Sequence, residues 1–276
     1  MTDVRDQAAP TLEQQRSAPS GDFIWYELMT TDPSGAKAFY DAVVGWNIEE
    51  NSSAPNGYRA IGRSDGKMAG GLLPLNDEMQ QHGARPGWLA YVSVADVDAT
   101  VASVERAGGK SLMAPFDIPD IGRVALISDP QGSPIYVMKP IPPANDPNAV
   151  SDVFSPSAEQ RVGWNELQTN DVENARSFYR EKFGWASDEF LDMGEMGKYR
   201  FFDHQGTRVG ALFDAANGQP PHWRFYIRVP SVSKAKATAE AKGGTIHMGP
   251  HQVPTGDWII VGSDPQGAEF ALVGGQ

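Results

Sequence analysis

The sequence predicts an α+β fold made of four βαβββ modules that form two tandem domains with curved mixed sheets. Two internal repeats predict it. Residues 23–75 match 162–214 at an offset of 139, and residues 87–110 match 222–245 at an offset of 135. Between Trp25–Trp46 and Trp164–Trp185, ten of 22 positions are identical. Each copy holds one stretch with helical spacing among short strand-like runs, as repeated α+β units require.

The first module begins with an aromatic and aliphatic run, Phe23–Thr30, which has strand character. Asp32 then suits an N-cap and Pro33 the first helical turn. Apolar residues follow at helical spacing until Gly45, which ends the predicted helix. Three short strands are expected near residues 46–51, 57–63 and 67–73.

The second module repeats this order. We expect a strand at 88–94, a helix from 96 to 107 and a stop at the glycine pair 108–109, then strands near 110–116, 122–128 and 134–139. The second half of the chain has the same sequence of elements. The expected organisation is a flexible N-terminal arm (1–22), a first domain (23–140), a proline-rich linker (141–161) and a second domain (162–276).

Composition narrows the classes of partner. The chain has 23 basic and 35 acidic residues, a net charge of −12, which disfavours nucleic acid and anionic membranes as partners. It has no cysteine, which excludes disulfides, thiolate metal sites and cysteine nucleophiles. No apolar run is long enough to cross a membrane, and the N-terminus does not read as a signal peptide. We expect a cytoplasmic protein with a small-molecule ligand; homo-oligomerisation stays open.

Three short motifs recur in both halves: Phe–Tyr on the first helix (Phe39–Tyr40, Phe178–Tyr179), the Gly–Trp pair that follows, and a closing Asp–Pro–Gln–Gly. With the order of elements, they resemble the superfamily of glyoxalase, bleomycin-resistance protein and extradiol dioxygenase, also called vicinal oxygen chelate, in a tandem two-domain form. The resemblance covers roughly residues 23–140 and 162–274. It implies that paired modules curl their sheets into open cups that hold a ligand, two cups here if modules pair within each half.

The resemblance also implies where a metal would be held, on the first and last strands of the paired modules. The matching residues are Trp25, Leu89 and Tyr136 in the first half and Trp164, Arg224 and Ala271 in the second. None is a good ligand for a divalent metal, because these side chains lack a suitable donor atom or carry a permanent positive charge. We therefore expect neither the family's metal nor another cofactor.

A non-standard metal site would have to use the histidines of the last module, His222, His247 and His251. His247 and His251 are four residues apart on an expected strand, which places them about 13 Å apart, too far to share one ion. Surface or hydrogen-bonded histidines are the favoured interpretation.

Strand alternation predicts which side chains face the cups. Each glutamate two residues after a tryptophan, Glu27 and Glu166, is expected to point into a cup. The partner modules place a tyrosine at the equivalent position, Tyr91 and Tyr226. Each pair is either a functional acid and hydroxyl, with the glutamate as base or ligand anchor, or a structural pair that satisfies itself. The residues leave both interpretations open.

The two predicted cups differ in polarity. The first is mainly apolar around Glu27, with Trp25, Met29 and Tyr136, which suits a flat or apolar ligand with one polar group. The second also has polar candidates for ligand binding: Trp164, Gln168, Arg224, Arg228 and Glu269. Our first hypothesis is metal-independent binding of a small organic molecule, with the first cup preferred. The alternatives are a lyase or isomerase that uses a cup glutamate or a divergent metal site, and an interaction protein with filled cups.

Overall fold

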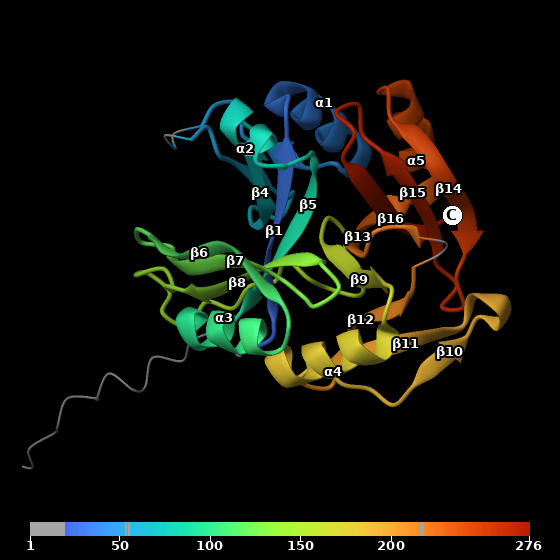
Figure 1. Cartoon of the computed structure of the whole chain (residues 1–276). Helices are drawn as coiled ribbons and strands as arrows, with labels where there is room; N and C mark the ends of the chain where they lie inside the picture. Colours follow the sequence, from blue (N-terminus) through green and yellow to red (C-terminus); the bar gives the residue numbers. More distant parts are fainter. Residues whose placement is uncertain (1–19, 53, 55, 216–217) are drawn as a thin grey trace, which may run out of the picture.

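The computed structural model describes residues 20–52, 54, 56–215 and 218–276, except the side chain of Met196. Over these residues the chain forms 16 strands in two eight-stranded mixed sheets (Figure 1). This is the predicted α+β fold of four βαβββ modules. The predicted N-terminal arm, 1–22, lies outside the described residues except for its last three.

The first domain contains two modules and one helix between them. The first module is β1 (Phe23–Thr30), α1 (Pro33–Val44), β2 (Asn47–Ile48), β3 (Arg59–Gly62) and β4 (Met68–Pro74). The second is β5 (Gly87–Ser93), α3 (Val97–Arg106), β6 (Lys110–Ile118), β7 (Gly122–Ser128) and β8 (Pro134–Pro140). The short helix α2 (Asp77–Gln81), capped by the side chain of Asn76, is an element that the sequence pattern did not predict.

The second domain repeats the order. Its first module is β9 (Val162–Thr169), α4 (Val172–Phe183), β10 (Phe190–Asp192), β11 (Lys198–His204) and β12 (Thr207–Asp214), with a short 3-10 turn, η2 (Gly194–Met196). The last module is β13 (His222–Ser231), α5 (Val232–Ala241), β14 (Thr245–Gln252), β15 (Trp258–Ser263) and β16 (Glu269–Gly275). No helix in the described parts of the chain has the length and apolar character needed to cross a membrane.

The repeated motifs begin and end the helices as expected. The Asp32 carboxylate accepts hydrogen bonds from the amides of Ser34 and Gly35 at the start of α1, and Asp171 caps α4 through the amide of Asn174. Gly45 and Gly184 end these helices at φ of 80° and 72°, a left-handed conformation that favours glycine. These caps determine where α1 and α4 begin and where the chain turns from each helix into the next strand.

The modules pair within each half of the chain. The strand order is β2-β3-β4-β1-β5-β8-β7-β6 in the first sheet and β10-β11-β12-β9-β13-β16-β15-β14 in the second. In each sheet the first strands of the two modules, β1 with β5 and β9 with β13, are antiparallel neighbours at the centre. Each eight-stranded sheet is therefore a joint product of two consecutive modules.

The helical sides of the two domains face each other. Helix α1 packs against α5 and α3 against α4, and one hydrophobic core runs through both domains. Three buried tyrosine hydroxyls cross the boundary: Tyr26 donates to Asn165 (2.7 Å), Tyr40 to Asp264 (3.1 Å) and Tyr179 to Asp129 (3.0 Å). The Phe–Tyr motif of each domain thus reaches the Asp–Pro–Gln–Gly turn of the other, and the opposite sheet faces are left to form the cups.

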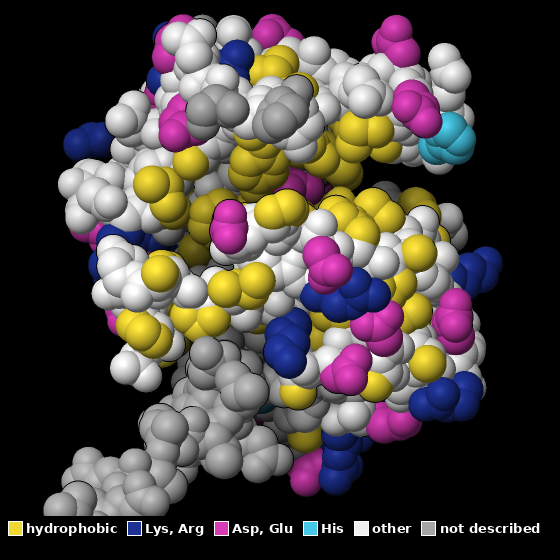
Figure 2. All heavy atoms as spheres, turned by 90° about the vertical axis from the view of Figure 1, so that its left-hand side faces the viewer, with side chains coloured by type: hydrophobic (Ala, Val, Ile, Leu, Met, Phe, Trp, Pro, Cys, Tyr) yellow, Lys and Arg dark blue, Asp and Glu magenta, His cyan; other side chains and the backbone are white. Residues whose placement is uncertain are grey.

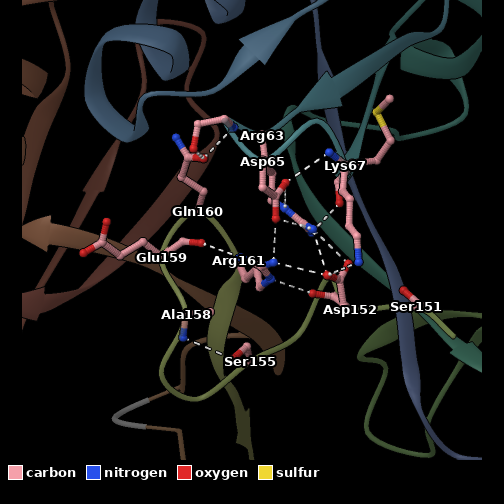
Figure 3. Close-up of polar contacts among 12 residues, drawn as sticks. Arg63, Asp65, Lys67, Ser151, Asp152, Ser155, Ala158, Glu159, Gln160 and Arg161 are labelled. Atoms are coloured by element: carbon pink, nitrogen blue, oxygen red, sulfur yellow. Dashed lines mark hydrogen bonds and ion pairs between the residues drawn. The ribbon is translucent and has the colours of Figure 1, made fainter.

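The proline-rich segment between the domains is fixed to the first domain by an ion-pair cluster (Figure 3). The Arg63 side chain, which is fully buried, contacts Asp65 at 3.1 Å and Asp152 at 2.9 Å. Arg161 contacts the same two carboxylates at 2.8 and 3.1 Å. Lys67 also contacts Asp152, at 3.3 Å, so three cations share two carboxylates and hold the end of the segment against the turn between β3 and β4.

Candidate functional site

The cup of the first domain is formed by side chains that strand register brings together. Trp25 lies opposite Tyr91 across β1 and β5, and Tyr91 lies opposite Tyr136 across β5 and β8. The two tyrosine rings stack with centroids 4.2 Å apart and planes 16° from parallel. These residues belong to an apolar cluster on the cup side of the sheet. The same cluster also contains Ile24, Met29, Leu89, Met113, Ile118, Val124, Leu126 and Met138. Of the residues predicted to face the cup, this cluster contains Trp25, Met29, Leu89, Tyr91, Tyr136 and Met138.

Figure 2 looks onto this side of the molecule and shows a cleft with largely hydrophobic walls. The cleft lies between the part of the first domain that carries β4 and α2 and the part that carries β6, β7 and β8. A hydrophobic, concave surface with few polar groups is the usual composition of a small-molecule site.

Glu27 is the single acidic group among the cup-facing residues of the first domain's β1, β5 and β8 that the structure describes. It is 3% exposed, and its Oε2 accepts a hydrogen bond of 2.9 Å from the Tyr91 hydroxyl. Its Oε1 is buried without a hydrogen-bond partner. Burial raises the pKa of Glu27 to about 7, although the nearby Tyr91 and Tyr58 hydroxyls oppose this. The carboxyl therefore changes charge near neutral pH.

Tyr58 is a site residue that the sequence analysis did not identify. Its hydroxyl accepts a 2.7 Å hydrogen bond from the Trp25 indole and lies close enough to Glu27 to lower the pKa of that carboxyl. Gly71, which lies opposite Glu27 on β4, makes room for it, because a Cβ there would overlap the Tyr58 hydroxyl. The available signal was a Tyr–Arg pair present in both halves, Tyr58–Arg59 and Tyr199–Arg200.

The second cup repeats this arrangement and adds a cation. The Glu166 Oε2 accepts from the Tyr199 hydroxyl at 2.8 Å, and Trp164 donates to Tyr199 at 2.7 Å. The Oε1 accepts from both Tyr226 and Arg224, each at 3.2 Å. In contrast to Glu27, both carboxyl oxygens of Glu166 have partners inside the protein.

Arg224 connects Glu166 to other predicted residues of the second cup. It donates to Glu269 through Nε and Nη2 at 2.8 and 3.1 Å. With its amide oxygen turned toward the guanidinium, Gln168 accepts from Nη1 and Nη2 at 2.7 and 3.1 Å. Burial raises the pKa of Glu166, and Arg224 is the largest opposing influence. The cluster is a charge set whose members satisfy one another, with Glu166 buried and Glu269 partly exposed.

Arg228 stands apart from this cluster. Its Nη1 and Nη2 donate to Asp257, at the beginning of β15, at 2.9 and 2.7 Å. From the predicted second-cup set, the structure therefore brings together Glu166, Tyr226, Arg224, Gln168 and Glu269, with Trp164 bonded to Tyr199. Arg228, further along β13, does not join them and pairs with Asp257 instead.

The positions at which the superfamily would hold a metal do not fit one. Trp25, Leu89 and Tyr136 meet in the first cup, and of these only Tyr136 offers an oxygen, whose pKa is raised by burial and by Glu27. In the second cup the corresponding place is taken by the Arg224 guanidinium. Among residues 20–276 as described, no group of three His, Asp or Glu side chains is arranged to hold a metal.

The histidines of the last module do not converge. His222 Nε2 lies 3.8 Å from a Glu269 oxygen that Arg224 already contacts. The exposed His247 bonds the Ser263 hydroxyl at 2.7 Å, and His251 is also exposed. Surface and hydrogen-bonded roles, the favoured interpretation from the sequence, agree with these positions.

Two further hollows lie outside the cups. One of about 390 Å³ is at the N-terminus of α4 and contains Lys198, Arg200 and Glu173. Its arginine is already paired with Glu173 at 2.8 Å. The other, of about 300 Å³, borders the ion-pair cluster of Arg161 and Asp65. Both are lined mainly by polar and charged residues, so the apolar first cup is the stronger candidate for an organic ligand.

The fold and site define a class: a two-domain protein whose paired βαβββ modules form two outward-facing β-sheet cups. The family model for the glyoxalase/bleomycin resistance protein/dioxygenase superfamily matches residues 23–137 and 161–272. The chain belongs to this superfamily, as the sequence motifs predicted.

Relatives and solved structures agree with this assignment. The chain is 31% identical over 251 residues to the Mycobacterium tuberculosis (strain CDC 1551 / Oshkosh) protein named "Putative glyoxylase CFP32", covering 90% of this chain and 93% of that protein. It is 29% identical over 265 residues to "Anthracycline biosynthesis protein DauV" of Streptomyces sp. (strain C5), covering 90% and 91%. A Mn(II)-bound glyoxalase from Novosphingobium aromaticivorans shares the fold at a TM-score of 0.60 and 16% identity, covering 93% of this chain and 83% of that one.

Proposed function

We propose that the first domain binds a small organic molecule in its cup, with Glu27 as the polar anchor and without the metal site of the superfamily. The observation that carries this proposal is the buried Oε1 of Glu27, which has no partner in a cup whose other walls are apolar. Leaving a buried polar atom unpaired costs about 1–3 kcal/mol, which a ligand that donates a hydrogen bond would recover.

The walls favour a ligand with a flat apolar body. The stacked pair Tyr91 and Tyr136 offers an aromatic surface, and half-buried Trp25 lies beside it. A relative named for anthracycline biosynthesis supports this choice, because anthracyclines are flat polycyclic compounds. Because Oε1 is shielded from solvent in the empty cup, a ligand must displace a neighbouring side chain. Met29 and Met138 are the flexible candidates for this movement.

A fragment screen by ligand-observed NMR tests this proposal. We expect flat aromatic fragments to bind the wild-type protein, to lose at least tenfold in affinity in Glu27→Gln, and to keep their affinity in the matched second-cup variant Glu166→Gln. Binding should persist in the presence of EDTA. Fragments that are lost with EDTA, or that bind all three proteins equally, would contradict the proposal.

A second candidate function is proton transfer, as in a lyase or isomerase of the same superfamily. It is favoured by the pKa of Glu27 near 7, close to the optimum for a general base, and by the Tyr91 hydroxyl at 2.9 Å. In an isomerisation, Glu27 would take a proton from one atom of the ligand and return it to another. Incubation of a bound carbon acid in D₂O would then place deuterium in the ligand, and Glu27→Gln would abolish this exchange.

A further inference from the structure

The two cups share one template that differs at the position facing the glutamate. On β5, Leu89 lies opposite Glu27; on β13, Arg224 lies opposite Glu166. In the second cup the Arg224 guanidinium lies on Glu166 Oε1 at 3.2 Å. The second cup thus shows, within the same chain, what satisfies a glutamate at this place in the fold.

The first cup has the glutamate but neither the arginine nor the polar residues that contact the arginine in the second cup. Beside Leu89 in place of Arg224, Met29 stands at the position of Gln168 and Pro134 at the position of Glu269. The tyrosine pair that holds the carboxyl is retained, with Tyr91 on Oε2 at 2.9 Å. Tyr91 is the counterpart of Tyr226, so Glu27 Oε2 corresponds to the Glu166 oxygen that Arg224 binds. The unpaired Oε1 is the other oxygen of the same carboxyl, which has no cation beside it in the first cup.

We propose that the first cup takes a ligand whose polar end is a compact cation, an ammonium, amidinium or guanidinium group, placed against Glu27 as Arg224 is placed against Glu166. The rest of the ligand would be the flat apolar body already inferred, so this inference rests on the proposed function. The ligand would supply to the first cup the cation that Arg224 supplies to the second.

Charge supports a cation over a neutral donor. An ionised carboxylate buried without a counter-charge is unfavourable, and a hydroxyl donor satisfies its hydrogen bond but leaves the charge in place. A cation does both. The net charge of −12 would also draw cations toward the protein.

Three matched probes separate the alternatives: 2-naphthylmethylammonium, 2-naphthylmethanol and 2-naphthoate, titrated by calorimetry at pH 8. We expect the ammonium to bind at least tenfold more tightly than the alcohol, and the carboxylate to bind most weakly. The preference should shrink as the pH falls below 7, where Glu27 takes up a proton, and should vanish in Glu27→Gln but not in Glu166→Gln.

Equal affinity for the ammonium and the alcohol would overturn the cation inference and leave the proposed function standing. Failure of all three probes would also overturn it, while fragments of other chemistry found in the screen would still support the proposed function. Failure of both experiments would remove both.

A variant tests the same place without an external ligand. Leu89→Arg should supply the guanidinium from within and lower the pKa of Glu27 by at least two units, read from its ¹³C carboxyl resonance. It should also abolish ammonium binding. A folded variant in which the Glu27 resonance titrates as in the wild type would show that the cup does not accept a cation there. If the variant does not fold, the probe titration decides alone.

Discussion

The two cups compare a glutamate that the protein satisfies with one that it does not. Glu166 and Glu27 occupy the same strand position, and each has a tyrosine on the neighbouring module and a second tyrosine held by a tryptophan. In the second cup Arg224 completes the set and links Glu166 to Glu269. In the first, Leu89 stands in place of Arg224, and Oε1 of Glu27 has no hydrogen-bond partner.

The difference teaches how one repeat can separate stability from binding. The second cup has the features of a structural charge cluster whose members satisfy one another. The first keeps a buried acid at a cost to stability, which is the pattern expected where a site is arranged for a ligand and not for its own stability.

Removing the cation from the second cup should give the largest effect. Arg224→Leu gives the second cup the leucine that the first cup has at residue 89. It leaves Glu166 and Glu269 without the arginine that both contact. We expect the free energy of unfolding at pH 7 to fall by about 3 kcal/mol, the usual result of breaking a buried ion pair on one side. Urea denaturation measures this.

The matched control is Arg123→Leu, which removes an arginine paired with Asp98 and Asp117 at the surface. Its unfolding transition should move little, because solvent screens exposed pairs. If the two variants lose the same stability, the second cup is not a structural charge cluster and the contrast between the cups fails.

The acid of the first cup should behave in the opposite way. Its folded-state pKa, about 7, is raised above the ordinary value of 4.5. The stability linked to Glu27 is therefore fully present below pH 4.5 and is lost as the pH rises through 7. Glu27→Gln should remove this loss and make the protein up to about 3 kcal/mol more stable relative to wild type at pH 8 than at pH 4.

Unfolding free energies across this pH range measure the effect, and Glu166→Gln is the control in the other cup. Burial raises the pKa of Glu166 too, so its pH slope should change in the same direction, but the variant should lose stability overall because it leaves Arg224 with one carboxylate fewer. A Glu27→Gln protein with the same pH slope as wild type would show that Glu27 is not the buried acid of the first cup.

The two cups also differ in the residue that lies opposite each glutamate on the other neighbouring strand. Gly71 lies opposite Glu27 on β4, and Ala211 lies opposite Glu166 on β12. Because a Cβ at residue 71 would overlap the Tyr58 hydroxyl, Gly71→Ala should displace Tyr58, free the Trp25 indole N–H and cost about 1–3 kcal/mol. The reverse change, Ala211→Gly, should keep the Trp164–Tyr199 bond and cost about 1 kcal/mol. Indole N–H resonances in ¹⁵N spectra report both bonds.

How far the sequence predicts this protein depends on the kind of signal. The modules, their helices and their caps follow from local periodicity and from repeats such as Asp32 and Asp171, so they were predictable. The glutamate–tyrosine pairs followed from strand alternation. Tyr58 did not, because it precedes β3 outside any alternating run, and the offset between the halves changes there from 139 to 141. The helix α2 is too short to show a helical period.

Whether the glutamates are structural or functional could not be decided from the sequence. Leu89 and Arg224 are visible there, but only the register of β1 with β5 and of β9 with β13 places each of them against its glutamate. The reciprocal bonds of Tyr40 and Tyr179 to the turns of the other domain also required the structure, since they depend on how the two helical faces meet.

The smallest expected effect tests how much each glutamate depends on its tyrosine. Tyr91→Phe removes one of two hydroxyls that lower the pKa of Glu27, so that pKa should rise further and stability above pH 7 should fall by about 1 kcal/mol more than at low pH. Tyr226→Phe should move the pKa of Glu166 less, because Arg224 and Tyr199 remain. ¹³C carboxyl titrations of both variants give the two shifts. Equal shifts would mean that Arg224 does not dominate the environment of Glu166, and the cups would then differ in geometry alone and not in how their acids are held.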